Sequence, residues 1–311
     1  MPVVWVAFGL GLLVVGAEVL VRGGAQIATR LGIPPMVVGL TVVSIGTSFP
    51  ELAIGIDATL RDAGPLAVGN IAGTNIVNLL LILGLSAAMV PLAIGSRTIR
   101  FELPVIATVS VMLVLLALDG ELSRLDGLLL LATAVAYTLA VVRLAVADSR
   151  NRSEQDAPVD EALTRQILMV VAGLGLVAIG ADWLVQGSVD LATSLGISEV
   201  VIGLTIVAIG SSAPELVTTL VSTVRGERDI AIGNLIGSSI YNITFILGVT
   251  ALVRPVGVTS ELIRVDLPLM AFVAFLLIPV FITGRRVSRA EGICFVLAYL
   301  AYLGTIIALR S

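Results

Sequence analysis

The chain has 311 residues, of which 58% are hydrophobic and 13% charged, and its formal net charge is -4. A soluble globular domain carries about 25% charged residues, so this composition and the mean hydropathy of +1.10 exclude that class and predict a polytopic membrane protein. Histidine is absent and the single cysteine, Cys294, has no partner, so we expect any bound metal to be a hard cation held by oxygen atoms.

Ten apolar runs bounded by polar or Pro/Gly turns predict ten membrane spans. In chain order they cover residues 3–29, 35–60, 66–91, 102–118, 124–147, 165–193, 199–223, 230–253, 263–282 and 290–309. No basic segment precedes the first run, so we expect it to remain as a permanent span.

A charged stretch divides the chain almost in half. We interpret residues 148–164 as a cytoplasmic linker between a first half, 1–147, with spans 1–5, and a second half, 165–311, with spans 6–10. This linker is too short for a folded regulatory domain.

The two halves are copies of one another. Residues 16–84 align without a gap to residues 180–248, at a shift of 164, and 32 of the 69 positions are identical. Because each copy contains five spans, an odd number, the second copy must enter the membrane with the opposite orientation. The prediction is an all-α integral membrane fold of ten transmembrane helices, built as two inverted five-helix repeats in which helices 2 and 7 are broken.

Loop arginines predict the orientation of the chain. With the N-terminus outside, twelve loop arginines are cytoplasmic and five are external, the five being Arg61, Arg124, Arg254, Arg264 and Arg310. The positive-inside rule therefore favours a multi-pass protein of the cytoplasmic membrane with both termini outside.

An acid next to a helix breaker stands in the middle of span 2. A charge at the position of Glu51 costs at least ~3 kcal/mol in a bilayer centre, which makes this residue a functional-site candidate. Pro50 cannot donate a backbone hydrogen bond, so we expect the helix to break where the acid, the hydroxyls before it and freed carbonyls meet. Such irregular backbone persists in a membrane only if it is buried in protein or lines a wet cavity.

The second copy repeats this arrangement with Pro214 and Glu215. Two carboxylates near the midplane repel each other, and a bound cation would remove the repulsion. The following span in each half opens with a small-residue motif, GNIAGT at 69–74 and GNLIGS at 233–238, which supplies further oxygen atoms. The predicted ligands are the two carboxylates, the hydroxyls of Ser48, Ser212, Thr74 and Ser238, the amides of Asn78 and Asn242, and carbonyls around Thr47 and Ser211.

The paired motifs GTSFPE with GNIAGTNIVN, and GSSAPE with GNLIGSSIYN, resemble the two α-repeats of the cation/calcium antiporter superfamily, most closely its sodium/calcium exchanger branch. The resemblance implies that calcium and sodium alternately occupy the sites formed by the residues above, with carbonyls at Ser44 and Ala208 adding a sodium site. Potassium-dependent relatives carry aspartate at the position of Asn242, and proton-coupled relatives carry an acid where this chain has Gly73 and Gly237. Both departures imply that neither potassium nor protons are the coupling ion.

These observations predict a sodium/calcium antiporter that works by alternating access, and no enzyme activity. The transported ions and membrane lipid are the expected partners, without a cofactor or nucleic acid, and we expect a functional monomer. Spans 1 and 6, which are rich in glycine, are the predicted sliding gates.

The nearest alternative is a calcium or other cation/proton antiporter that uses the same glutamates. An intramembrane hydrolase would need a nucleophile with a base, or the paired-aspartate motif of membrane aspartyl proteases, and this chain has neither histidine nor that motif. A passive channel would show no saturation and no strict counter-transport.

Overall fold

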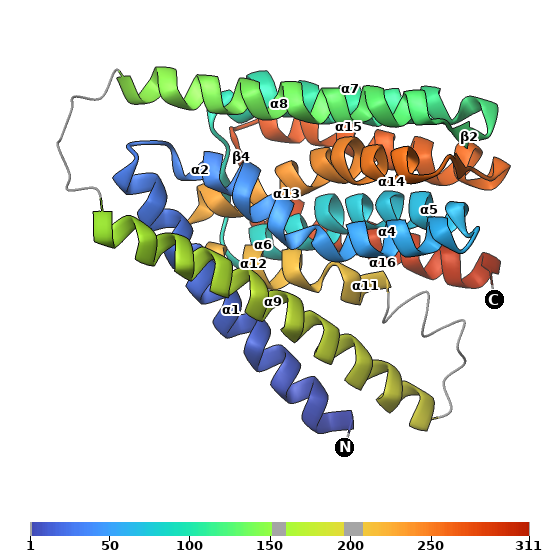
Figure 1. The fold of residues 1–311 in the computed structure, drawn as a ribbon, viewed down its shortest axis with the longest axis horizontal. Helices are drawn as coiled ribbons and strands as arrows, with labels where there is room; N and C mark the ends of the chain where they lie inside the picture. Colours follow the sequence, from blue (N-terminus) through green and yellow to red (C-terminus); the bar gives the residue numbers. More distant parts are fainter. Residues whose placement is uncertain (1, 151–159, 196–207, 311) are drawn as a thin grey trace. The chain divides into compact units, whose positions relative to one another are not determined.

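The computed structural model describes residues 2–150, 160–195 and 208–310, and this part of the chain is almost entirely helical (Figure 1). Within it, nine helices are long and apolar enough to cross a membrane, and each matches a predicted span to within a few residues. Helices are expected because they satisfy every backbone polar group internally, as a bilayer requires. The predicted span 199–223 begins outside the described residues, which resume at Ala208.

The described chain forms two compact units, and each unit contains segments of both sequence repeats. Unit 1 consists of Met1–Thr47, Leu139–Asn234 and Leu300–Ser311, and unit 2 of Ser48–Thr138 and Leu235–Tyr299. The compact units therefore differ from the two sequence halves. Helices also extend into the segment interpreted as a linker, because α8 (Arg124–Arg150) and α9 (Asp160–Ser194) reach into residues 148–164 from both sides.

Unit 1 is organised around the pair of helices α1 and α9. Its described elements are α1 (Pro2–Arg30), α2 (Pro35–Val38), the π-helical turn η1 (Gly39–Val43), α3 (Ser44–Thr47), the second half of α8, α9, α11 (Ala208–Ser211), α12 (Ala213–Val224), the first half of α13 (Arg228–Tyr241) and the end of α16 (Arg289–Arg310). In Figure 1, α1 and α9 run alongside each other, and α12 packs against both.

Glycines allow α1 and α9 to approach closely. A Cβ atom on Gly16 would lie 2.7 Å from the backbone nitrogen of Val177, and one on Gly180 would lie 2.6 Å from that of Leu13. Leu13 and Val177 are themselves part of a buried apolar cluster. The two glycine-rich spans predicted as gates thus form one closely packed helix pair, as small residues permit in membranes.

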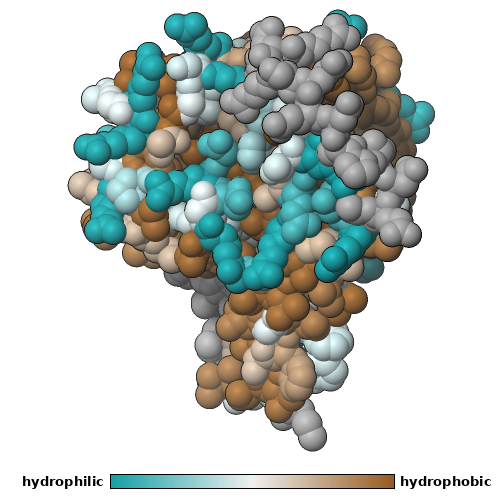
Figure 2. Space-filling view, turned by 90° about the vertical axis from the view of Figure 1, so that its left-hand side faces the viewer, coloured by the Kyte–Doolittle hydropathy of each residue, from teal (hydrophilic) through white to brown (hydrophobic). Residues whose placement is uncertain are grey.

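Apolar side chains cover the outer surface of this pair. Exposed residues include Val4 and Phe8 on α1, and Leu168 and Val171 on α9. The lower part of Figure 2, which corresponds to the lower ends of α1 and α9 in Figure 1, is mostly hydrophobic. A surface of this kind is suited to contact with lipid and would be costly in water.

Unit 2 is organised around α7 and α15, which pack against each other. Its elements are α4 (Phe49–Leu60), α5 (Gly64–Ile76), η2 (Val77–Ile82), α6 (Leu83–Met89), β1 (Leu92–Ala93), η3 (Thr98–Glu102), α7 (Leu103–Leu116), η4 (Ala117–Asp119), β2 (Glu121–Leu122), the first half of α8, the second half of α13, η6 (Asn242–Ile246), α14 (Leu247–Val253), β3 (Val256–Gly257), η7 (Leu262–Asp266), α15 (Leu267–Ile282), β4 (Arg286–Val287) and the first half of α16 (Arg289–Arg310). Here η4 is a 3-10 turn, and the other η elements are π-helical turns.

Two short antiparallel strand pairs confirm that the repeats are inverted. By sequence alignment, β1 corresponds to β3 and β2 corresponds to β4. In the structure β1 pairs with β4, and β2 pairs with β3, so each pair joins a loop of one repeat to a different loop of the other. The helix α7 connects β1 to β2, which puts the two pairs at opposite ends of unit 2 (Figure 1). Corresponding loops therefore lie at opposite ends, as inversion requires. These two-residue strands are the only β-structure within the described ranges.

Matching capping boxes begin α8 and α16, the last helix of each repeat. The backbone N–H of Ser123 donates to Asp126 Oδ2 at 2.8 Å, and that of Ser288 donates to Glu291 Oε2 at 2.7 Å. Each acid thus reaches back to the N-cap residue and satisfies a free backbone donor.

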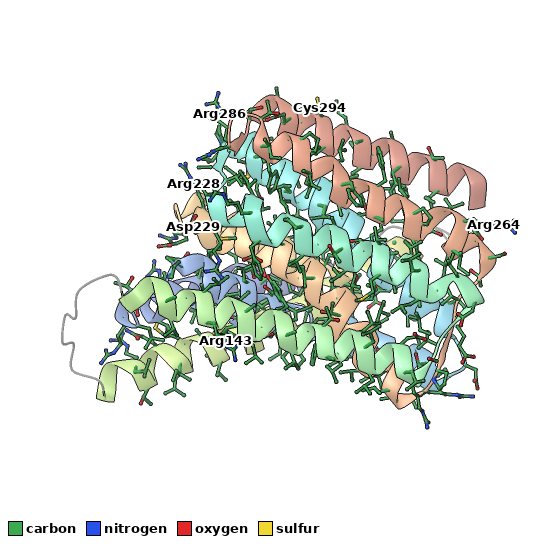
Figure 3. All side chains as sticks on the ribbon, turned by 90° about the horizontal axis from the view of Figure 1, so that it is seen from above. Arg143, Arg228, Asp229, Arg264, Arg286 and Cys294 are labelled. Carbon is green, nitrogen blue, oxygen red and sulfur yellow. The ribbon has the colours of Figure 1, made fainter. Side chains whose placement is uncertain are left out.

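Charged residues stand at both ends of unit 2. Figure 3 shows Arg264, just before α15, and Arg286, just after it, at opposite ends of that helix, while Cys294 lies on α16. Arginines that flank both ends of an apolar helix are typical of a membrane span.

Candidate functional site

The chain breaks its helix at the same position in both repeats. Ser48, between α3 and α4, has φ -86° and ψ 7°, and Ser212, between α11 and α12, has φ -88° and ψ 8°. In each case a proline stands two residues later, in the first turn of the next helix, where its missing N–H costs nothing. The breaks predicted from Pro50 and Pro214 are confirmed.

Each break brings a glutamate into the first turn of the following helix. Glu51 lies in the first turn of α4 and Glu215 in the first turn of α12, and both side chains are fully buried. The positive end of the helix dipole favours a carboxylate at this position. A buried carboxylate still needs compensation by hydrogen bonds or a cation, because burial removes it from water.

In unit 1, the residues before the first break are connected to the second repeat by hydrogen bonds. The Thr47 hydroxyl donates to Asn234 Oδ1 at 3.3 Å, and Asn234 Nδ2 donates to Thr219 Oγ1 at 3.1 Å. The Ser44 hydroxyl donates to the carbonyl of Gly39, in the π-helical turn η1. In addition α3, which carries Ser44 and Thr47, contacts α12, which carries Glu215.

Asn234 links helices of unit 1. It lies six residues after the start of α13 at Arg228, and its side chain is fully buried. Its hydrogen bonds to Thr47 and Thr219 connect α13 to α3 and α12.

A row of buried polar side chains continues along α12 from Glu215. It comprises Thr218, Thr219, Ser222 and Thr223, at the i, i+3, i+4 spacing of one helix face. Aligned residues of the first repeat are Ile54, Gly55, Ala58 and Thr59, so this polar face belongs mainly to the second repeat. Repeat symmetry alone did not predict it.

In unit 2, helices that carry predicted ligands pack against each other. The helix α4, with Glu51, contacts α5, which carries Thr74, and η6, which begins with Asn242. The Thr74 hydroxyl, both amide atoms of Asn78 and Oδ1 of Asn242 are buried and have no hydrogen-bond partner among the described residues. The hydroxyl oxygen and the two amide oxygens are atoms that a cation could use.

Two π-helical turns mark the symmetry-related amides. Asn78 is the second residue of η2, and Asn242 is the first residue of η6. Turns of this kind interrupt the regular α-helical hydrogen bonding and are frequent at functional sites. The composition of these two spans does not indicate the turns.

The predicted site residues divide between the two units. Unit 1 contains Ser44, Thr47, Ala208, Ser211, Ser212 and Glu215, and unit 2 contains Ser48, Glu51, Thr74, Asn78, Ser238 and Asn242. With Ala208 left aside, all of these side chains are buried. Sequence reasoning missed Asn75, which is buried in unit 2 and bonds to Asn242, although an asparagine beside Thr74 in an apolar span was a visible signal.

Acid-rich metal clusters are not part of this arrangement. Among residues 2–150, 160–195 and 208–310, no group of three or more Asp, Glu, Cys or His side chains could hold a metal. A cation bound by the described residues therefore depends mostly on hydroxyl, amide and carbonyl oxygen, with few carboxylates.

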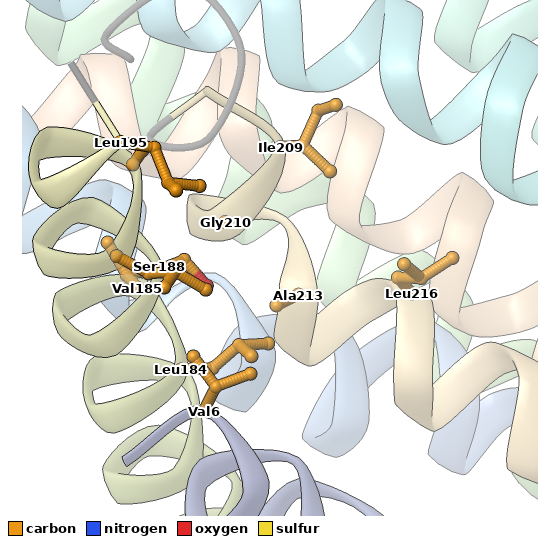
Figure 4. Close-up of a pocket in the computed structure, with 11 residues that line it drawn as sticks. Val6, Leu184, Val185, Ser188, Leu195, Ile209, Gly210, Ala213 and Leu216 are labelled. Carbon is orange, nitrogen blue, oxygen red and sulfur yellow. The ribbon is translucent and has the colours of Figure 1, made fainter. Parts of the chain in front are cut away.

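A cavity of about 510 Å³ in unit 1 is a poor alternative for an ion site. It lies between α9 and the α11–α12 break, where Leu184, Val185, Ile209 and Leu216 line it (Figure 4). A cation needs oxygen ligands, and this lining is almost wholly apolar.

Comparisons with known proteins identify the family. The family described as "Sodium/calcium exchanger protein" matches residues 1–143 and 165–308. The chain is 38% identical over 254 residues to the "Inner membrane protein YrbG" of Escherichia coli, an alignment that covers 79% of this chain and 78% of that protein. It is 32% identical, over an alignment of 333 residues covering 95% of each chain, to the "Sodium/calcium exchanger MaX1" of Methanosarcina acetivorans.

A solved structure of the sodium-calcium exchanger NCX_Mj, soaked with zero Na+ and Ca2+, is similar to this chain over nearly its whole length. Its TM-score is 0.84 at 29% sequence identity, and the alignment covers 98% of each chain. The family match includes both repeats and nearly the whole chain. This chain therefore belongs to the sodium/calcium exchanger family and is a multi-pass membrane transporter, not an enzyme.

Proposed function

We propose that this protein is a secondary active antiporter that exchanges sodium for calcium by alternating access. One observation carries the proposal: both inverted repeats have a fully buried glutamate directly after an identical helix break. Transporters built from inverted repeats bind their substrates at discontinuous helices. The relatives named as sodium/calcium exchangers support the choice of ions.

The glutamates provide the negative charge for which the ions compete. One calcium ion or several sodium ions can neutralise the same carboxylates, and only the neutralised site allows the change of conformation. The proposed ligands are Glu51 and Glu215, the hydroxyls of Ser48, Ser212, Thr74 and Ser238, the amide oxygens of Asn78 and Asn242, and the carbonyls of Thr47, Ser211, Ser44 and Ala208. Such a set meets the preference of calcium for six to eight oxygen atoms and also suits sodium.

The α1–α9 pair serves as the moving gate. The close glycine contacts between the two helices and their exposed apolar side chains support movement of the pair as one body. Cross-links that fix α1 to α12 should abolish exchange, whereas cross-links between α1 and α9 should not. Full exchange with α1 fixed to α12 would contradict this part of the proposal.

The protein acts in the cytoplasmic membrane, with both termini outside and residues 148–164 in the cytoplasm, as a monomer surrounded by lipid. The arginine distribution supports this orientation, and the E. coli relative is named as an inner membrane protein. Labelling of single cysteines placed in residues 151–159 of a Cys294→Ser background should occur only from the cytoplasmic side.

The exchange itself is tested with purified protein in liposomes. Uptake of radioactive calcium should require sodium inside the vesicles and should fail in potassium-loaded vesicles. A proton gradient alone should drive no uptake. Equal uptake with a proton gradient and no sodium would replace this function with cation/proton antiport.

A further inference from the structure

Three side-chain and backbone groups in unit 2 form a short chain of hydrogen bonds. Asn75 Nδ2 donates to the backbone carbonyl of Ser239 at 3.0 Å, and Asn242 Nδ2 donates to Asn75 Oδ1 at 3.2 Å. Asn75 is 1% exposed and Asn242 is fully buried, so water does not compete for these bonds. The chain joins α5 to the junction of α13 and η6.

The chemistry of the groups determines which way each amide points. A backbone carbonyl only accepts hydrogen bonds, so Asn75 must turn its NH2 group toward Ser239. The sulfur of Met270, a weak acceptor 3.7 Å from Asn75 Nδ2, favours the same orientation. Asn75 Oδ1 then faces Asn242, which must turn its own NH2 group toward Asn75.

One consequence concerns the other end of Asn242. With its NH2 group used, its Oδ1 points away from Asn75, and this buried oxygen has no hydrogen-bond partner in the part of the chain that the structure describes. An unpaired buried acceptor is costly, and a cation is a partner that would satisfy it. Rotation of the amide by 180° would present NH2 to the cation instead, which would be repulsive.

The first repeat has no equivalent arrangement. Asn78 corresponds to Asn242, yet neither of its amide atoms has a hydrogen-bond partner within residues 2–150, 160–195 and 208–310. Asn75 corresponds to Ser239, whose hydroxyl donates to the carbonyl of Leu235 in its own helix. The two symmetry-related amides therefore differ, since only Asn242 is held in one orientation.

We propose that Asn75 is a positioning residue that holds Asn242 as an oxygen-only ligand for the transported cation, while Asn78 remains free to reorient. This inference rests on the proposed function, because it assumes that Asn242 contacts the ion. Partners that orient a metal ligand typically affect metal affinity 10–100-fold.

The test is a double-mutant cycle on the purified full chain, with calcium binding measured by calorimetry. Asn75→Ala should weaken calcium binding roughly tenfold or more, because Asn242 can then rotate. In an Asn242→Asp background, Asn75→Ala should not weaken binding, since a carboxylate presents oxygen in either orientation. Ser239→Ala removes a hydroxyl but keeps the carbonyl used by Asn75, so it should leave calcium affinity within about twofold.

A structural role for Asn75 would give a different pattern. Equal weakening of calcium binding by Asn75→Ala in both backgrounds would overturn the proposal. So would an unchanged calcium affinity when Asn75→Ala is made in the chain that keeps Asn242. If Asn75→Ala does not fold, Asn75→Ser replaces it with the residue that the second repeat carries and has the same expected effects.

In liposomes, these variants should raise the calcium concentration for half-maximal uptake more than they lower the maximal rate. Failure of sodium-driven uptake by the unmodified chain would separately reject the proposed exchange, because the calorimetric result does not depend on transport.

Discussion

Arg225, at the end of α12, binds Glu18 in α1, with Nε 2.6 Å from Oε2. Glu18 also binds Arg22, one turn further along α1. The first repeat differs, because Arg61, the counterpart of Arg225, binds Asp57 on its own helix. The second repeat has valine at the position of that aspartate, so Arg225 can reach α1 instead.

This bridge connects the proposed gate to the helix of Glu215. Both side chains are partly exposed, at 51% for Arg225 and 21% for Glu18, so the pair should contribute only about 0.2–1 kcal/mol. We expect Arg225→Gln to change the maximal rate of sodium-driven calcium uptake by less than about fivefold and to leave half-saturation by calcium unchanged. Arg61→Gln is the matched control. A loss of calcium affinity as large as that caused by Glu215→Gln would contradict this view.

Close helix packing predicts that alanine substitutions at two glycines of α9 change the stability of the protein differently. A Cβ atom on Gly180 would lie 2.6 Å from the backbone nitrogen of Leu13, so Gly180→Ala should destabilise the protein by about 1–3 kcal/mol. Gly175 has no neighbouring atom within 4 Å of an added Cβ, and Gly175→Ala should be neutral or slightly stabilising. Thermal unfolding in detergent measures both. Equal stability of the two variants would mean that α1 and α9 do not meet at Gly180.

Two neighbouring threonines on α12 should also respond differently. Both Thr218 and Thr219 are fully buried, but Thr219 accepts a hydrogen bond from Asn234, whereas the Thr218 hydroxyl has no partner among the described residues. Thr219→Val should therefore cost about 1–3 kcal/mol, while Thr218→Val should leave stability unchanged or raise it. Chemical unfolding of the ion-free protein compares the pair. A larger loss for Thr218→Val would show that its hydroxyl has a structural partner.

A buried acid outside the ion-binding motifs gives a further stability prediction. Glu102 is fully buried and accepts a hydrogen bond of 2.7 Å from the Tyr137 hydroxyl. Tyr137→Phe removes this donor and should lower thermal stability by about 1–3 kcal/mol. Thr108→Val, which removes an exposed hydroxyl on α7, is the control and should have little effect. Unchanged stability in Tyr137→Phe would mean that other groups fully satisfy Glu102.

The features that the sequence predicted well depend on local geometry or on the repeat. Pro50 and Pro214 restrict the backbone around them, so the breaks at Ser48 and Ser212 could be placed from the sequence. The odd number of spans in each copy required inversion, which the exchange of β-strand partners confirms.

Other features depend on which way side chains face after the helices pack. Glu18 has a local partner at Arg22, and nothing in the spacing indicates its second partner, Arg225. The bonds of Asn234 to Thr47 and Thr219 connect it to other helices, and the helical spacing of its own span does not indicate them. The bond between Asn75 and Asn242 joins different spans and requires a π-helical turn, so periodicity could not predict it.

The central claim is that Glu51 and Glu215 supply the charge for which sodium and calcium compete. The most direct measurement is calcium uptake into sodium-loaded liposomes by the unmodified chain and by Glu51→Gln, Glu215→Gln and Glu121→Gln, the last changing an exposed acid as the control. We expect uptake to vanish in the first two variants and to persist in the third. Sodium-driven uptake that survives either Glu51→Gln or Glu215→Gln would contradict the account.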